Sequence, residues 1–274
     1  MAATTWQPIG SISPGTLDEA RRQAHNAVHW VARLAHSYLA AEPGNTHVDL
    51  IRDARDGALV TRGVGEGLSV GVDVAELTLQ FREHGARSQH RLRLDGRSAA
   101  AVEAWFLVEL LHRHCDRDRF SKVLPYDTAD LMTGDVEEYA QERLAAELAE
   151  LARWQSNAAA VLQQVSGGIG QIQCSPRHFD IAVVLPVEGA PGAVRAGFAP
   201  GDERLPEPYF YIATHAWLDA AAPAGMPRIG RLQTRDLVVD VLPSSEIVAA
   251  DAGAEPVLKF LSAGITAARR RLSN

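Results

Sequence analysis

An order of elements that occurs twice along the chain is the feature that most constrains its fold. Apolar residues at three- and four-residue steps predict amphipathic helices over residues 16–39 and 98–114. The same periodicity predicts a long helix over residues 135–165, with Asp135 as its N-cap. A last helix is predicted over residues 256–272, with a proline in its first turn. Short runs bounded by turn residues lie between the two helices of each pair, so the chain reads helix, strands, helix, twice.

The short runs have the two-residue alternation that is typical of strands with one buried face. In the first half they cover residues 47–52, 58–62, 68–72 and 77–81, with a fifth around Leu92 and Leu94; in the second half they cover 170–174, 179–186, 194–198, 209–213 and 237–242. A polar, irregular segment over residues 116–134 connects the halves. We expect an α+β fold of two pseudo-symmetric halves, residues 1–125 and 126–274, each an antiparallel sheet flanked by helices, packed as one unit.

Matched residue pairs support an internal repeat. Asn157-Ala158 follows Asn26-Ala27 by the same number of residues as His178-x-Asp180 follows His47-x-Asp49. Each Asn-Ala pair lies late in a predicted helix, and each His-x-Asp stands at the start of the strand that follows. These matches predict that the two halves arose by duplication.

Composition and charge narrow the class of protein. The chain has 274 residues, of which 46% are hydrophobic, enough for a substantial core. Its net charge of −7 disfavours a nucleic-acid partner or an anionic membrane. Two cysteines, an N-terminus without a signal-peptide pattern and no apolar run long enough to span a bilayer predict a cytoplasmic protein. A homodimer through unpaired sheet edges and a small-molecule ligand are both compatible with the sequence. The cofactor, if any, is unknown from the sequence.

The stretch CSPRHFDIAVVL, residues 174–185, carries the most suggestive pair of ionisable residues. In an extended strand, residues two apart point to the same face, so His178 and Asp180 are expected to be neighbours. One interpretation is structural, with His178 bonded to a neighbouring helix end and oriented by Asp180. The other is a ligand or metal site.

A second candidate stretch, PGDERLPEPYFYI, follows from residue 200. Pro200-Gly201 predicts a turn, and Asp202, Glu203 and Glu207 supply carboxylates beside it. Tyr209 and Tyr211 share a strand face, where aromatic alternation is typical of core or cross-strand packing. These tyrosines, together with His47 of the first half, are the candidate ligand-binding residues.

Two stretches of the second half, CSPRHFDIAVVLP and FAPGDERLPEPYFYI, resemble a group of uncharacterised bacterial proteins related to domains of unknown function. In that group a His-Phe-Asp strand precedes a Pro-Gly-Asp turn and a Glu-Pro-Tyr segment. The matching residues are His178, Phe179, Asp180, Pro200, Gly201, Asp202, Glu207, Pro208, Tyr209 and Tyr211. Members commonly have Trp-Pro-His-His before the Phe-Asp, whereas this chain has Arg177 in place of the first histidine. The resemblance implies a shared fold and no particular activity.

Other clusters of metal-ligand residue types lack a complete pattern. His25, His29 and His36 form one stripe on the first helix, but Asn26 stands where a zinc-protease helix needs a glutamate. We therefore expect a solvent-facing or interface stripe. The helix end at residues 112–116, His-Arg-His-Cys-Asp, has no second cluster at zinc-finger spacing, and the sequence predicts no metal site.

Two hypotheses for function follow. The first is a non-catalytic binding or structural protein, favoured because no complete catalytic or cofactor motif is present. The second is an enzyme whose cleft uses His178 as general base or as metal ligand, oriented by Asp180, with acids from Asp202, Glu203 and Glu207. The enzyme hypothesis requires His178 and at least one of these loop acids to converge on a concave pocket.

Overall fold

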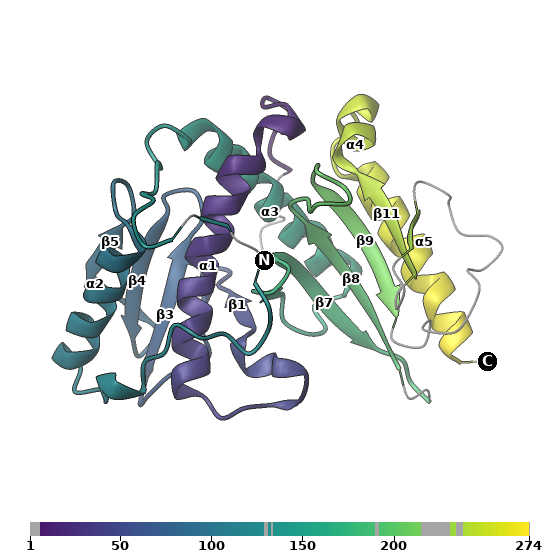
Figure 1. Cartoon of the computed structure of the whole chain (residues 1–274). Coiled ribbons are helices and arrows are strands. Elements are labelled where there is room, and N and C mark those ends of the chain that lie inside the picture. Colours follow the sequence, from purple (N-terminus) through teal and green to yellow (C-terminus); the bar gives the residue numbers. More distant parts are fainter. Residues whose placement is uncertain are drawn as a thin grey trace. The chain divides into compact units, whose positions relative to one another are not determined.

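The computed structural model describes residues 6–128, 131–132, 134–189, 192–214, 231–233 and 238–273 (Figure 1). Helices and antiparallel sheets together confirm the predicted α+β class. Leu237, the first residue of the last predicted strand, lies outside the described residues. None of the helices among these residues is long and apolar enough to span a membrane.

The chain forms two compact units, and each unit draws on both halves of the sequence. The N-unit comprises Glu19–Ala152 and Gln173–Phe179. The C-unit comprises Met1–Asp18, Arg153–Ile172 and Asp180–Asn274. The predicted boundary between the two halves at residue 125 stays a prediction.

The N-unit holds an antiparallel sheet in the order β6-β1-β2-β3-β4-β5. Its strands are β1 (Leu50–Arg52), β2 (Leu59–Val60), β3 (Leu68–Asp73), β4 (Thr78–Glu83), β5 (Ala86–Arg93) and β6 (Gln173–Ser175). Its helices are α1 (Asp18–Tyr38), α2 (Ala99–His112) and the first part of α3 (Ala145–Val165), with short 3₁₀ turns η2 (Pro43–Val48) and η3 (Arg117–Arg119).

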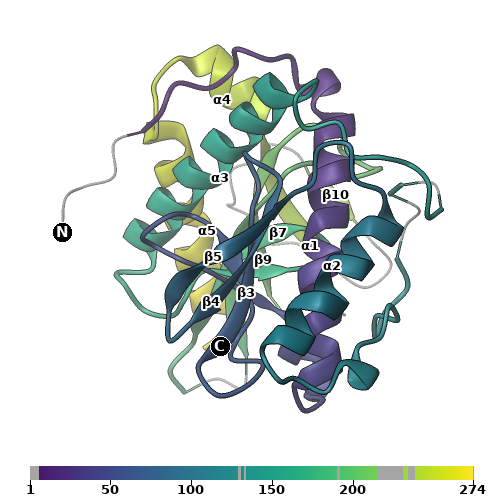
Figure 2. The same ribbon diagram turned by 90° about the vertical axis from the view of Figure 1, so that its left-hand side faces the viewer.

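Helices α1 and α2 lie on the same face of strands β3 to β5 (Figures 1 and 2). Phe81 of β4 contacts the Phe106 ring of α2, with ring centroids 6.1 Å apart, and Phe106 stacks on Trp30 of α1 at the same distance. The alternation of β4 directs Leu79 and Phe81 toward this core, and both are fully buried. The opposite face of the same strands is polar.

The predicted helix start at Asp135 is wrong, because α3 begins ten residues later at Ala145. Backbone bonds join Gly96 N–H to the Tyr139 carbonyl at 2.8 Å and Tyr139 N–H to the Arg97 carbonyl at 3.1 Å. This pairing holds the segment before α3 in an extended conformation beside the start of α2. Such long-range pairing is invisible to a local capping pattern.

The C-unit holds an antiparallel sheet in the order β10-β11-β9-β8-β7. Its strands are β7 (Asp180–Pro186), β8 (Ala193–Ala199), β9 (Tyr209–Thr214), β10 (Arg231–Gln233) and β11 (Val238–Pro243). The remaining elements are η1 (Pro14–Thr16), the second part of α3, α4 (Ser244–Ala250) and α5 (Glu255–Leu272).

One face of the C-unit sheet packs on α3 and α5. Trp154 of α3 stacks on Phe198 of β8 with ring centroids 6.1 Å apart and planes 9° apart. Helix α5 runs along β8, β9 and β11 (Figure 1). It approaches β9 most closely at Gly264, where an added Cβ would lie 2.8 Å from Cγ1 of Ile212. The absence of a side chain at residue 264 therefore sets the distance between helix and sheet.

We expect Gly264→Ala to destabilise the protein. Overpacking a core costs about 1–3 kcal/mol, which exceeds the roughly 1 kcal/mol that alanine gains over glycine in a helix. Guanidinium unfolding of both proteins measures the difference in the free energy of unfolding. Gly15→Ala is the matched control, because a Cβ at residue 15 meets nothing within 4 Å. A Gly264→Ala protein as stable as the wild type would contradict this close packing.

Candidate functional site

The stretch CSPRHFDIAVVL contains a turn, not the start of a continuous strand. Strand β6 ends at Ser175 and β7 begins at Asp180, with His178 exposed in the turn between them. The Ser175 carbonyl accepts hydrogen bonds from the N–H groups of His178 and Phe179, at 3.2 and 2.8 Å. Phe179 has φ 55°, a left-handed conformation. The prediction that His178 and Asp180 share a strand face is therefore wrong, because a strand geometry is not present at residue 178.

Two buried histidines of α1 hold this turn. Nε2 of His25 and Nε2 of His29 lie 2.7 and 3.0 Å from the Pro176 carbonyl oxygen, and since a carbonyl can only accept, both rings donate. His25 also stacks on Phe179, with ring centroids 5.3 Å apart. Of the two alternatives expected for this stripe, solvent-facing or interface, the solvent-facing one is wrong for these two residues, because both are buried. Their role in the N-unit is to satisfy and position a buried turn.

Burial decides the charge state of His29. Removal from water disfavours the imidazolium, and the nearby charges of His25 and Arg33 act in the same direction. Together these effects lower the pKa of His29 to about 2, despite the opposing hydrogen bond to Pro176. His29 is therefore a neutral donor at physiological pH.

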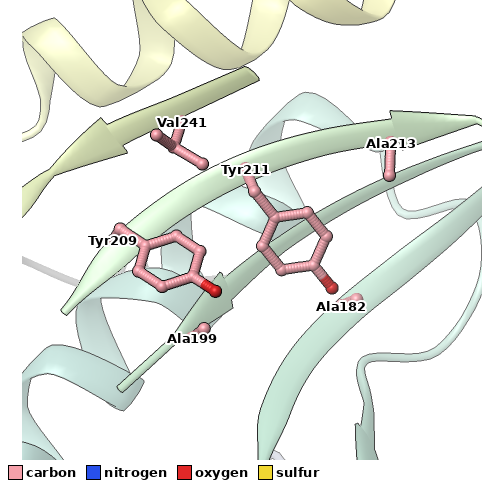
Figure 3. Packing of buried hydrophobic residues seen from close by; sticks show 6 residues of the cluster. All are labelled: Ala182, Ala199, Tyr209, Tyr211, Ala213 and Val241. Carbon is pink, nitrogen blue, oxygen red and sulfur yellow. The ribbon is translucent and has the colours of Figure 1, made fainter. Parts of the chain in front are cut away.

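Asp180 belongs to a buried network on the face of the C-unit sheet opposite α5. Its Oδ2 accepts hydrogen bonds from Nη2 of Arg195, at 2.8 Å, and from the Tyr211 hydroxyl. Nε of Arg195 donates to the Tyr211 hydroxyl at 2.9 Å. Figure 3 shows Tyr211 reaching from β9 across β8 toward β7. The ring lies over Gly197, where any Cβ would approach it to 2.4 Å, so glycine at this position is what allows the network to close.

This network favours fixed protonation states. Burial, and the negative charge of Asp180, raise the pKa of Tyr211 well above its usual range. Although burial alone would lower it, the pKa of Arg195 is raised by Tyr211 and Asp180. A phenol and a guanidinium held in this way are poor proton carriers near neutral pH. Oδ1 of Asp180 is buried and has no hydrogen-bond partner among the described residues.

The loop acids are engaged in structural contacts. Oδ1 of Asp202 accepts from the N–H groups of Arg204 and Leu205, at 2.8 and 2.9 Å, and Oδ2 accepts from the Tyr209 hydroxyl at 2.7 Å. Tyr209 and Tyr211 pack with Ala182, Ala199, Ala213 and Val241 in one apolar cluster (Figure 3). Asp202 therefore stabilises its own turn and fixes the position of the Tyr209 hydroxyl.

Glu207 caps helix α4. Its Oε2 accepts from the Ser244 hydroxyl and from the Ser245 N–H, both at 2.7 Å, and Oε1 accepts from the Ser245 hydroxyl at 3.1 Å. A carboxylate at a helix N-terminus satisfies free N–H groups and interacts favourably with the helix dipole. Glu203, by contrast, is exposed in the loop.

His47 is a buried partner of His36 in the N-unit. The Glu42 N–H donates to Nδ1 of His47 at 3.3 Å, so Nε2 of His47 donates to Nδ1 of His36 at 2.9 Å. Burial, and then the charge of His36, lower the pKa of His47. The structure thus brings Asp180 together with Tyr211, and Asp202 with Tyr209. It gives Glu207 and His47 other partners.

Sequence reasoning missed a cavity on the polar face of β3 to β5. The cavity has a volume of about 90 Å³, and its lining includes Thr78, Gln80, Arg82, Arg87, Arg91 and Arg93. Two acids, Asp73 and Glu76, also line it. Register explains this gathering: Thr78 pairs with Arg93, Gln80 with Arg91 and Arg82 with Arg87. The arginines spaced along RSQHRLR were visible in the sequence, but their strand partners were not.

Arg82 forms the buried floor of this cavity. Its Nη1 and Nη2 bond to Oδ2 of Asp53 at 2.5 Å and to Oδ2 of Asp56 at 2.8 Å, both from the turn between β1 and β2. The hydrogen bond from Arg55, with the charge of Arg82, holds the pKa of Asp53 below its usual range although partial burial opposes this. Nε of Arg82 is buried and has no hydrogen-bond partner in the part of the chain that is described.

The three exposed arginines differ in how far they are neutralised. Arg87 pairs with Asp56 at 2.6 Å, whereas Arg93 lies 3.6 Å from Glu76 at the solvent-exposed rim. The Arg91 side chain makes no hydrogen bond or ion pair with any described residue. The cavity therefore contains one free guanidinium beside two that are only partly neutralised, which is the chemistry of an anion site.

Comparison with family models, with curated protein sequences and with solved structures finds no match to this chain. The resemblance to uncharacterised bacterial proteins therefore stays a prediction. The geometry of the described residues is what argues for function.

We expect the His29 ring to stay neutral between pH 8 and pH 5. The unfolded chain takes up this proton near pH 6.5, so stability should fall as the pH drops below that value. Imidazole NMR spectra, with His29 assigned through His29→Asn, should show constant His29 shifts over this range. Urea unfolding should show a smaller acid loss of stability in His29→Asn than in the wild type. A His29 resonance that titrates near pH 6.5 would contradict this.

All five tyrosines should resist ionisation while the protein is folded. Burial raises the pKa of Tyr38 to about 12 and takes those of Tyr126, Tyr139, Tyr209 and Tyr211 further above the usual range. The unfolded chain loses these protons near pH 10, so stability should fall as the pH rises above 10. Absorbance at 295 nm should stay flat through pH 10 and then rise together with loss of circular dichroism. A reversible rise near pH 10 in folded protein would argue against buried phenols.

Proposed function

We propose that the protein binds a small anion bearing a phosphate or carboxylate group in the arginine-lined cavity of the N-unit. The observation that carries this proposal is the Arg91 side chain, which lines the cavity without a partner among the described residues, together with Arg82, Arg87 and Arg93. The proposal follows the first of the two hypotheses from the sequence, a binding protein, and adds that the ligand is a small anion.

Size and charge both suit such a ligand. A site needs roughly 10–15 Å³ of accessible volume for each water it holds, so a cavity of about 90 Å³ accepts a group of phosphate size. Guanidinium groups match carboxylates and phosphates in planar, two-point geometry. On a chain with net charge −7, a local excess of arginine also steers anions to this face. Asp73 and Glu76 at the lining disfavour a long polyanion such as nucleic acid.

The enzyme hypothesis gains no support from its candidate acids. Asp202 and Glu207 use their oxygens to hold a turn and to cap α4, and Asp180 is tied to Arg195 and Tyr211. Asp202 and Glu207 could act on a substrate only by breaking these contacts, and Oδ1 of Asp180, which has no hydrogen-bond partner among the described residues, is buried. We therefore infer a binding role in preference to catalysis around His178.

We also infer that the two halves are duplicates and that the protein is cytoplasmic. Asn26 of α1 accepts from the hydroxyl of Tyr139, which precedes α3; Asn157 of α3 bonds the backbone of Gln7, which precedes α1, at 2.8 and 2.9 Å. These matched asparagines hold matched segments, each from the start of the other half. Neither Cys115 nor Cys174 forms a disulfide bond among the described residues, in keeping with a reducing compartment.

Arg91→Ala tests the proposed anion site. Isothermal titration calorimetry with phosphate and with citrate, at constant ionic strength, should show saturable binding to the wild type. A hydrogen bond to a charged group contributes about 1.5–3 kcal/mol, so we expect about tenfold to hundredfold weaker binding in the variant. Stability should not change, since the Arg91 side chain has no partner among the described residues to lose.

Arg270→Ala is the matched control. Arg270 is an exposed arginine at the end of α5, so this substitution removes the same charge at a distant place in the sequence. It should leave anion binding unchanged. Equal weakening in both variants would show that the anions respond to net charge alone. No binding of either anion to the wild type would also defeat the proposal.

A further inference from the structure

Three side chains of metal-ligand type meet where β5 passes the end of α2, apart from the arginine-lined cavity. His90 comes from β5, and Glu109 and His112 come from α2. One potential ligand atom from each lies within 4.8 Å of those of the other two. Glu109 and His112 are three residues apart, which places them on one face of the helix. His90 faces α2 because the alternation of β5 directs it away from the face that carries Arg91.

The carboxylate of this cluster is pre-oriented. Glu109 is only 6% exposed at its side chain, and its Oε2 pairs with Nη1 of Arg113 at 2.5 Å. Arg113 lies over the Phe81 ring, 4.3 Å from its centroid, and forms an ion pair with Glu83 at 3.1 Å. This support leaves Oε1 of Glu109 directed at Nδ1 of His90, 3.2 Å away. Partners of this kind fix the ligand atoms of protein metal sites.

The two histidines leave the cluster open to solvent. The His90 side chain is 61% exposed, and His112 is also exposed at the last residue of α2. Their rings are in edge contact, with centroids 6.4 Å apart. Ligand atoms in a tetrahedral zinc shell lie roughly 3.4 Å apart, so small rotations of these exposed rings bring all three atoms onto one ion. The negative end of the α2 dipole favours a cation at the same place.

We propose that His90, Glu109 and His112 form a binding site for a divalent transition-metal ion of the zinc class. Two imidazoles and one carboxylate are a ligand set that zinc accepts, with a fourth position left for water. Arg113 neutralises Oε2 of Glu109 and reserves Oε1 for the ion. The second histidine ligand beside His112 is therefore His90 of β5, nineteen residues before Glu109, and not the neighbouring His114.

The test uses the full chain after treatment with a chelator. Zinc binding is followed by calorimetry, the number of ions per chain by mass spectrometry of the desalted protein, and coordination by the visible absorbance of bound Co²⁺. We expect one ion per chain in the wild type and at least tenfold weaker binding in His90→Ala and in His112→Ala. Circular dichroism confirms folding, and His90→Gln provides a second variant that retains a polar side chain.

His114→Ala is the matched control, since His114 is exposed two residues beyond His112 and outside the cluster. It should bind zinc as the wild type does. Binding lost in His114→Ala but kept in His90→Ala would place the ion on the segment 112–116 and overturn the proposal. So would the absence of saturable binding to the wild type, or equal binding by all variants.

Discussion

Burial of one face of each sheet under helices is the constraint on which the rest of this structure depends. In the N-unit, Phe81 lies against Phe106 of α2; in the C-unit, Phe198 lies against Trp154 of α3. Removing apolar area from water is the main favourable term in folding. Because successive strand residues point to opposite faces, one face of a sheet can be apolar and buried while the other face carries polar residues. Every candidate site on a strand belongs to such an opposite face, or to the turn or edge beside it.

The two units use their polar faces differently. In the C-unit, Asp180, Arg195 and Tyr211 bond to one another, and an apolar cluster lies beside them. Removing one member of such a buried ion pair would leave the other charge uncompensated, which lowers the stability of the fold. In the N-unit, four arginines line a cavity; Asp53 and Asp56 pair with Arg82 and Arg87, and the Arg91 side chain has no ion-pair partner among the described residues. The first arrangement is closed, and the second retains capacity for an anion.

Histidines follow the same division between structure and chemistry. His25 and His29 are buried donors to a turn carbonyl, and His47 is a buried partner of His36. Their surroundings disfavour the charged form or consume their hydrogen bonds. His90 and His112 are exposed beside the buried carboxylate of Glu109, so they retain free nitrogen atoms for a ligand. Environment, and not residue type, separates these two groups.

The sequence by itself determined the α+β class and most element positions, because the periods of helix and strand depend on local spacing. Helix α5 and strands β7 to β9 lie where the pattern predicted them. Tertiary structure alone decided that Asp135 does not begin a helix, that His178 sits in a turn, and that Glu207 caps α4. It also decided which residues lie together: Arg91 beside residues of β3 and β4 at the cavity, and His90 beside Glu109. Register between strands and the packing of a helix on a sheet set these contacts, and neither is encoded in the spacing of residues along one element.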